Sequence, residues 1–88
     1  MKLIIAILRD QDAEAVIQAL IAGGYRVTRI ASTGAFFKRG SSTIIVGVDE
    51  IQIEGAFQVI RSNVSTSESL TSSRATLFVL NVADFTQV

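Results

Sequence analysis

Residues 2–8 read Lys-Leu-Ile-Ile-Ala-Ile-Leu, and this almost unbroken aliphatic run decides the fold. Such a run is typical of a central strand that is buried on both faces of a sheet. The apolar residues that follow recur at helical spacing: Ala13, Val16, Ile17, Leu20 and Ile21. We therefore expect a strand followed directly by a helix, with Asp10 as its N-cap and Gly23-Gly24 as its stop signal.

The remainder of the chain repeats this order of elements. Two further strands are predicted over residues 25–31 and 43–48, and a last strand over residues 75–82. Asp49 is placed to cap a second helix, whose buried stripe would be Ile53, Ala56, Phe57 and Ile60. The order indicates a ferredoxin-like βαββαβ fold of the α+β class, with a four-stranded antiparallel sheet and two helices on one face. The 88 residues suit a single domain, residues 1–88.

The strands are too apolar for one face of the sheet to lie in water. Aliphatic side chains occupy both alternation phases, including Val27, Ile44, Val46, Leu77, Val79 and their neighbours. Apolar residues make up 49% of the chain and charged residues 18%, a high ratio for so small a domain. We therefore expect the second face of the sheet to be buried by subunit association.

The composition excludes several classes of function. The chain has no cysteine and no histidine, so disulfides, thiolate nucleophiles, imidazole bases and the usual zinc, iron or copper sites are excluded. Asp10, Asp12 and Glu14 form an acidic cluster, but carboxylates are favoured at a helix start, so we interpret them as helix-start residues and expect no metal. We expect a protein that is not an enzyme and carries no cofactor.

Charge and hydropathy also limit the partners. The net charge is zero, which disfavours a nucleic-acid-binding protein, and the strands over residues 2–8 and 43–48 lack the aromatic side chains that stack RNA bases. The apolar run at the start is too short for a signal peptide or a membrane span. We expect a cytoplasmic protein with no direct membrane insertion.

The segment from Gly24 to Gly47 carries the functional signal. Residues 15–48 contain no Asp or Glu, although four cations lie there: Arg26, Arg29, Lys38 and Arg39. Arg26 with Lys38 or Arg39 would neutralise phosphate charge, and Phe36 or Phe37 would stack on a base. Hydrogen-bonding hydroxyls and glycines for close backbone approach complete the candidate site: Thr28, Ser32, Thr33, Ser41, Ser42, Gly34 and Gly40. A solvated turn is the alternative interpretation of such a loop.

These residues also carry a family likeness. The chain resembles the PII-like signal proteins of the cyclic-di-AMP receptor branch in residues 5–12, in residues 24–37, at Gly40, in residues 45–49 and in residues 75–80 with Phe85. The Arg-x-Thr followed by Ala-Ser-Thr-Gly-x-Phe is a fairly specific part of this likeness. The branch usually has a longer loop after the second helix than the Ser/Thr-rich residues 62–73, so this chain resembles a short-loop variant.

The resemblance implies a homotrimer with ligand clefts between neighbouring subunits. It implies that Arg26 and Thr28 face the ligand, that Phe36 and Phe37 line the adenine pocket, and that Gly47 permits close approach. The expected function is a non-enzymatic signalling protein that senses cyclic-di-AMP or a related adenine nucleotide and regulates partner proteins. The alternative, from a different class, is a ligand-independent trimeric module that docks on a transporter or an enzyme.

Overall fold

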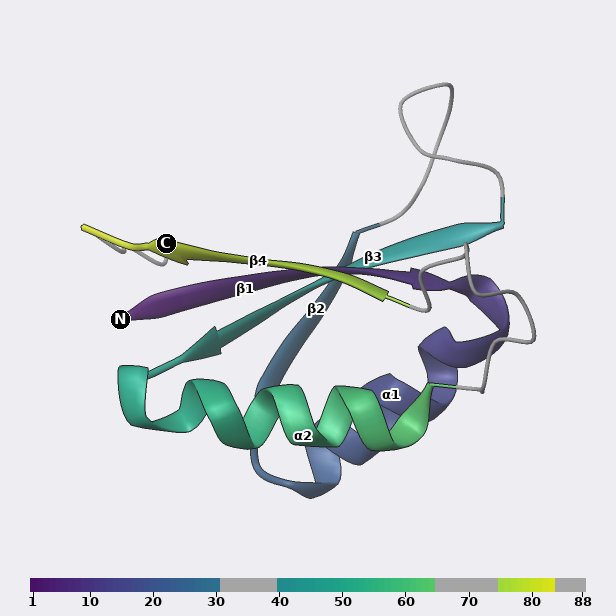
Figure 1. Cartoon of the computed structure of the whole chain (residues 1–88), viewed down its shortest axis with the longest axis horizontal. Helices are drawn as coiled ribbons and strands as arrows, with labels where there is room; N and C mark the ends of the chain where they lie inside the picture. Colours follow the sequence, from purple (N-terminus) through teal and green to yellow (C-terminus); the bar gives the residue numbers. More distant parts are fainter. Residues whose placement is uncertain (31–39, 65–74, 84–88) are drawn as a thin grey trace.

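The alternating elements of the chain form one sheet with both helices on the same side (Figure 1). The computed structural model describes residues 1–30, 40–64 and 75–83. Its elements are β1 (Lys2–Arg9), α1 (Asp10–Ala22), β2 (Arg26–Ile30), β3 (Ser41–Val48), the short 3-10 helix η1 (Glu50–Gln52), α2 (Ile53–Asn63) and β4 (Ala75–Asn81). The strand order is β2-β3-β1-β4, and every neighbouring pair is antiparallel. The ferredoxin-like α+β fold is thus confirmed.

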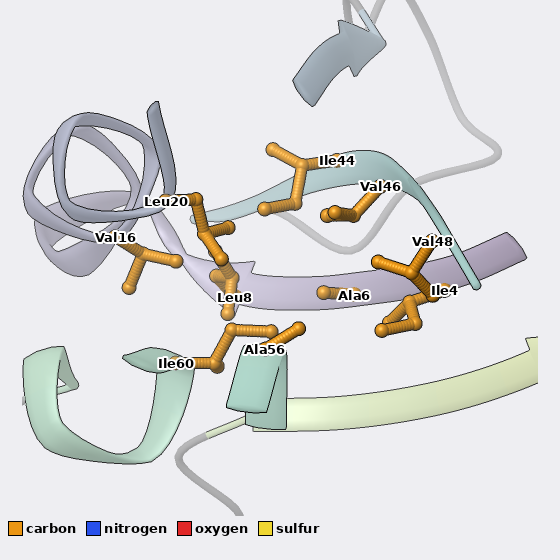
Figure 2. Packing of buried hydrophobic residues seen from close by; sticks show 10 residues of the cluster. All are labelled: Ile4, Ala6, Leu8, Val16, Leu20, Ile44, Val46, Val48, Ala56 and Ile60. Atoms are coloured by element: carbon orange, nitrogen blue, oxygen red, sulfur yellow. The ribbon is translucent and has the colours of Figure 1, made fainter. Parts of the chain in front are cut away.

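The core lies between the sheet and the two helices. Alternate residues of β1 and β3 turn toward the helices and meet apolar side chains of α1 and α2. Figure 2 shows this cluster, which comprises Ile4, Ala6, Leu8, Val16, Leu20, Ile44, Val46, Val48, Ala56 and Ile60. The predicted stripe of α2 is confirmed, since Ala56 and Ile60 are buried while Ile53 and Phe57 pack against the cluster. Burial on this scale is the main favourable term in holding the helices to the sheet.

The register assigns a face to every strand residue, because directly paired residues share a face. Val27 pairs with Val46, so it joins the helix-covered face. Leu77 and Val79 pair with Ala6 and Ile4 on that same face. The five aliphatic residues singled out in the sequence therefore share one face of the sheet, and other residues make the second face apolar.

The second face carries no helix among the described residues. We call it the open face, and its members are Leu3, Ile5, Ile7, Arg9, Arg26, Thr28, Ile30, Ser41, Thr43, Ile45, Gly47, Thr76, Phe78 and Leu80. Its centre is aliphatic and only half-buried, while Phe78 and Leu80 on the edge strand β4 are 50% and 47% exposed. This face therefore leaves large apolar side chains in water in a single copy of the chain.

The helix starts differ from the expected caps. Asp10 is the first residue of α1 rather than its N-cap, a place taken by Arg9, whose side chain bonds to Asp12 and does not cap the helix backbone. The Asp10 carboxylate instead accepts a hydrogen bond from Ser42 on β3. Asp49 precedes η1 rather than α2, and its N–H donates to Oε1 of Gln52 at 2.8 Å. A 3-10 turn thus separates the predicted cap from the helix proper.

The end of α1 confirms the predicted glycine stop and leads directly into β2. Gly24 has a φ of +88°, which glycine adopts without steric cost, and the N–H of Tyr25 donates to the carbonyl of Leu20 at 3.0 Å. A Cβ on Gly55 would lie 2.7 Å from the Tyr25 hydroxyl, and one on Gly23 would lie 3.2 Å from its ring. Tyr25 therefore packs between the end of α1 and the first turn of α2, where a Cβ on either glycine would crowd its ring or hydroxyl.

Candidate functional site

Arg26 and Thr28 project from the same face of β2. Arg26 pairs with Gly47 and Thr28 with Ile45, which places both side chains on the open face. Both residues are exposed, and β2 is an edge strand of the sheet. The structure therefore brings together three of the predicted site residues: a guanidinium, a hydroxyl and a glycine beside them.

Gly47 lies beside Arg26 with little of the chain above it. A Cβ at this position would meet only the Cε atom of Met1, at 3.7 Å, which is an ordinary van der Waals contact. The backbone there is regular β-strand without positive φ. Within the described part of the chain, neither sterics nor backbone geometry requires glycine at position 47. Because Gly47 has no side chain, the backbone beside Arg26 is left uncovered on the open face.

Gly40 directly precedes β3, and Ser41 is its first residue, at the opposite end of the strand from Gly47. Gly40 has a φ of +83°, and its carbonyl accepts a hydrogen bond from the N–H of Asp10 at 2.8 Å. Ser41 is the first residue of β3 and pairs with Arg9. Ser41 and Gly47 are separated by most of the length of β3, so their Cα atoms are about 20 Å apart at the rise of a strand. The predicted site residues that the structure describes thus fall into two groups: Arg26, Thr28 and Gly47 near the end of β3, and Gly40 and Ser41 at its start.

Four predicted site residues lie outside the described part of the chain: Thr33, Gly34, Phe36 and Phe37. Ser32, Lys38 and Arg39 do as well, together with most of the Ser/Thr-rich residues 62–73 and with Phe85. The described site therefore consists of the two strands that flank residues 31–39.

Ser42 belongs to the other face of the sheet, which corrects its place among the candidate ligand hydroxyls. It pairs with the core residue Leu8, and it is buried at 6% exposure. Its hydroxyl donates to Oδ1 of Asp10 and accepts from Nη2 of Arg29 at 3.1 Å. Because side chains alternate along a strand, Ser42 cannot share a surface with Ser41.

Thr43 was missed by the sequence analysis and lies on the open face between Ile7 and Ile30. The residue is 4% exposed, and its Oγ1 has no hydrogen-bond partner among the residues that the structure describes. A buried hydroxyl without a partner costs about 1–3 kcal/mol. The alternation of β3, which puts Thr43 on the same face as Ser41 and Ile45, is the signal by which it could have been found.

No group of three or more Asp and Glu side chains in residues 1–30, 40–64 and 75–83 is arranged to hold a metal ion. No helix in the same ranges is long and apolar enough to cross a membrane.

Comparison with known proteins gives the family. A family model described as "Cyclic-di-AMP receptor" matches residues 1–77. A crystal structure of a functionally unknown protein from Pediococcus pentosaceus ATCC 25745 is similar, with a TM-score of 0.80 and 28% sequence identity over 99% of this chain and 96% of that one. The match covers both strands of the candidate site, the start of the sheet and both helices. The chain therefore belongs to the cyclic-di-AMP receptor family, a PII-like family of nucleotide-binding signal proteins.

Proposed function

We propose that this chain binds cyclic-di-AMP, or a related adenine nucleotide, between the subunits of a homotrimer and thereby regulates partner proteins without catalysing a reaction. The observation that carries the proposal is the placement of Arg26, Thr28 and Gly47 together on the open face, in a chain of the cyclic-di-AMP receptor family. An exposed guanidinium and a hydroxyl two residues apart on one face of an edge strand suit the phosphate and ribose groups of a nucleotide. Gly47 leaves space for the ligand to approach the backbone.

The separation within β3 supports a site between subunits. About 20 Å lies between the Gly47 and Ser41 ends of the strand, more than a small nucleotide spans in a compact conformation. A neighbouring copy that contributes its own Gly40 and Ser41 would bring both groups to one ligand. In this arrangement one subunit supplies Arg26, Thr28 and Gly47, and its neighbour supplies Gly40 and Ser41 together with Thr33, Gly34, Phe36 and Phe37.

The open face supports association of identical subunits. Its aliphatic centre and the half-exposed Phe78 and Leu80 would lie against the same face of other copies. Burial of apolar surface is the usual driving force for permanent assemblies, and closed symmetry is their usual form. The same exposed residues favour the second candidate function, a trimeric module that docks on a transporter or an enzyme without a ligand.

A calorimetric titration with cyclic-di-AMP tests the proposal, with ATP, ADP and AMP as comparisons. We expect saturable binding of cyclic-di-AMP near one molecule per subunit. Arg26→Ala should weaken it by roughly 10- to 100-fold, because a hydrogen bond to a charged group contributes about 1.5–3 kcal/mol. Arg61→Ala is the matched control, since Arg61 is exposed on α2 and away from the open face.

The outcomes separate the two candidates. Unchanged affinity in Arg26→Ala, beside a wild-type protein that binds, would show that the nucleotide lies elsewhere. Absence of binding by all four nucleotides to the wild-type protein would leave the ligand-independent docking module as the better description.

A further inference from the structure

A polar cluster joins the start of α1 to β2 and β3 on the helix-covered side of the sheet. Arg29 pairs with the core residue Ile44, so its side chain leaves β2 on this side, opposite to Arg26. Its Nη2 donates to Oγ of Ser42 at 3.1 Å, and the Ser42 hydroxyl donates in turn to Oδ1 of Asp10. The hydroxyl thus uses its single proton and one lone pair, and it connects a cation with a carboxylate.

Asp10 bonds to two residues at the start of β3, one directly before the strand and one within it. Its backbone N–H donates to the carbonyl of Gly40 at 2.8 Å, and its carboxylate accepts from Ser42. Ser41 lies between these two attachment points and pairs with Arg9, so its side chain belongs to the open face. The first residue of α1 therefore bonds to the residues on both sides of Ser41, to the backbone of Gly40 and to the side chain of Ser42.

Glu14 also reaches Arg29 but has a different character. Its Oε2 lies 3.7 Å from Nη1 of Arg29, and its side chain is 72% exposed. Exposed ion pairs of this length contribute little, typically about 0–1 kcal/mol. The link through Ser42, which is 6% exposed, is the stronger tie because water competes with it less.

From this geometry we propose that Asp10, Ser42 and Arg29 form a polar clamp that positions Gly40 and Ser41 for the nucleotide and links nucleotide binding to the start of α1. The proposal rests on the proposed function and names the residues that regulate its site. None of the three clamp side chains is required to touch the ligand, so they are positioning residues. If the nucleotide binds to Gly40 or Ser41, the contacts at Asp10 change its affinity. By linkage, nucleotide binding then changes the stability of those contacts by the same free energy.

The clamp also gives a route from the open face to the helix layer. The nucleotide would lie on one side of the sheet, and the Asp10 carboxylate and the first turn of α1 lie at its other side. A shift of the backbone at Ser41 would move its neighbour Ser42, whose hydroxyl is hydrogen-bonded to Asp10 at the start of α1. A partner protein that contacts α1 could therefore read the occupancy of the nucleotide site.

The test measures cyclic-di-AMP affinity and amide exchange in the same full-length variants. Ser42→Ala and Asp10→Ala should each weaken binding about three- to tenfold, the range of one hydrogen bond. Asp10→Asn keeps an acceptor for Ser42 and should stay within about twofold of wild type, as should the control Glu14→Ala. Hydrogen exchange of the Asp10 amide, followed by NMR, should slow when cyclic-di-AMP is added to the wild-type protein and should not slow in Ser42→Ala.

The results distinguish failure of the clamp from failure of the function. The clamp is overturned if Asp10→Ala and Ser42→Ala bind cyclic-di-AMP as well as the wild-type protein does and show the same slowing of amide exchange at position 10. The nucleotide site stands in that case. If the wild-type protein binds no adenine nucleotide, the proposed function fails, and the clamp fails with it. Asp10 is exposed, so Asp10→Ala keeps the experiment decisive should Ser42→Ala fold poorly.

Discussion

The two faces of this sheet are made by neighbouring residues of the same strands, yet they differ in how deeply their apolar side chains are buried. On the helix-covered face, Ile4, Ile44 and Val46 are fully buried against α1 and α2. On the open face, Ile5 and Ile45 are only half-buried, and Phe78 is half-exposed. The difference teaches that a single copy of the chain buries the apolar side chains of one face, while those of the open face stay partly exposed until another surface covers them.

The largest expected effect separates two adjacent isoleucines of β1. Ile4→Ala should lower the free energy of unfolding by about 2–5 kcal/mol, because it leaves a cavity among fully buried side chains. Ile5→Ala should cost about 1–2 kcal/mol in dilute protein, because Ile5 is half-buried there. Urea denaturation at low and high protein concentration measures both. Equal losses at every concentration would remove the distinction between the faces.

A charge on the open face should have the next largest effect. Phe78→Glu should reduce the mass measured by light scattering to that of a single chain, because the carboxylate would be buried without a partner in any contact through this face. The accompanying loss of stability should be about 1–2 kcal/mol, the part of the Phe78 side chain that association would bury. Ile51→Glu is the control, since Ile51 is 92% exposed in η1. An unchanged mass in Phe78→Glu would contradict association through the open face.

The smallest expected effect compares Gly40, which directly precedes β3, with Gly47 near the end of the strand. Gly40→Ala should cost about 1 kcal/mol, because its φ of +83° is unfavourable for any residue with a Cβ. Gly47→Ala should change stability by less than about 0.5 kcal/mol, since its Cβ would meet only Met1 at an ordinary contact distance. Thermal unfolding of the two variants measures the difference. A larger loss in Gly47→Ala at concentrations where the chain associates would place Gly47 in a tight contact between copies.

The fold was predictable because its signals are local and periodic. The aliphatic run of β1, the helical spacing of α1 and the paired glycines after it all lie within the first 24 residues, and each agrees with the structure. The faces of β2 were also predictable, since Arg26 and Thr28 alternate with Val27 and Arg29. Element ends were less accurate: β3 begins at Ser41, two residues before its predicted start, because strand pairing with β1 extends to Arg9.

The polar side of the site could not be predicted from local pattern. Asp10 and Ser42 are 32 positions apart, and their hydrogen bond depends on the register between β1 and β3. A capping residue and a loop hydroxyl were the best interpretations of these two residues taken separately. Their contact arises only when β3 starts early enough to turn Ser42 toward the helices.

The packing of Tyr25 between Gly23 and Gly55 also makes the chain report on itself spectroscopically. The chain has one tyrosine and no tryptophan, so its intrinsic emission comes essentially from this ring. Tyr25 directly precedes β2, and its half-buried ring packs against the core between α1 and α2. Any rearrangement that shifts the two helices relative to each other, or that pulls on the start of β2, should appear as a change in that emission without a label having to be attached.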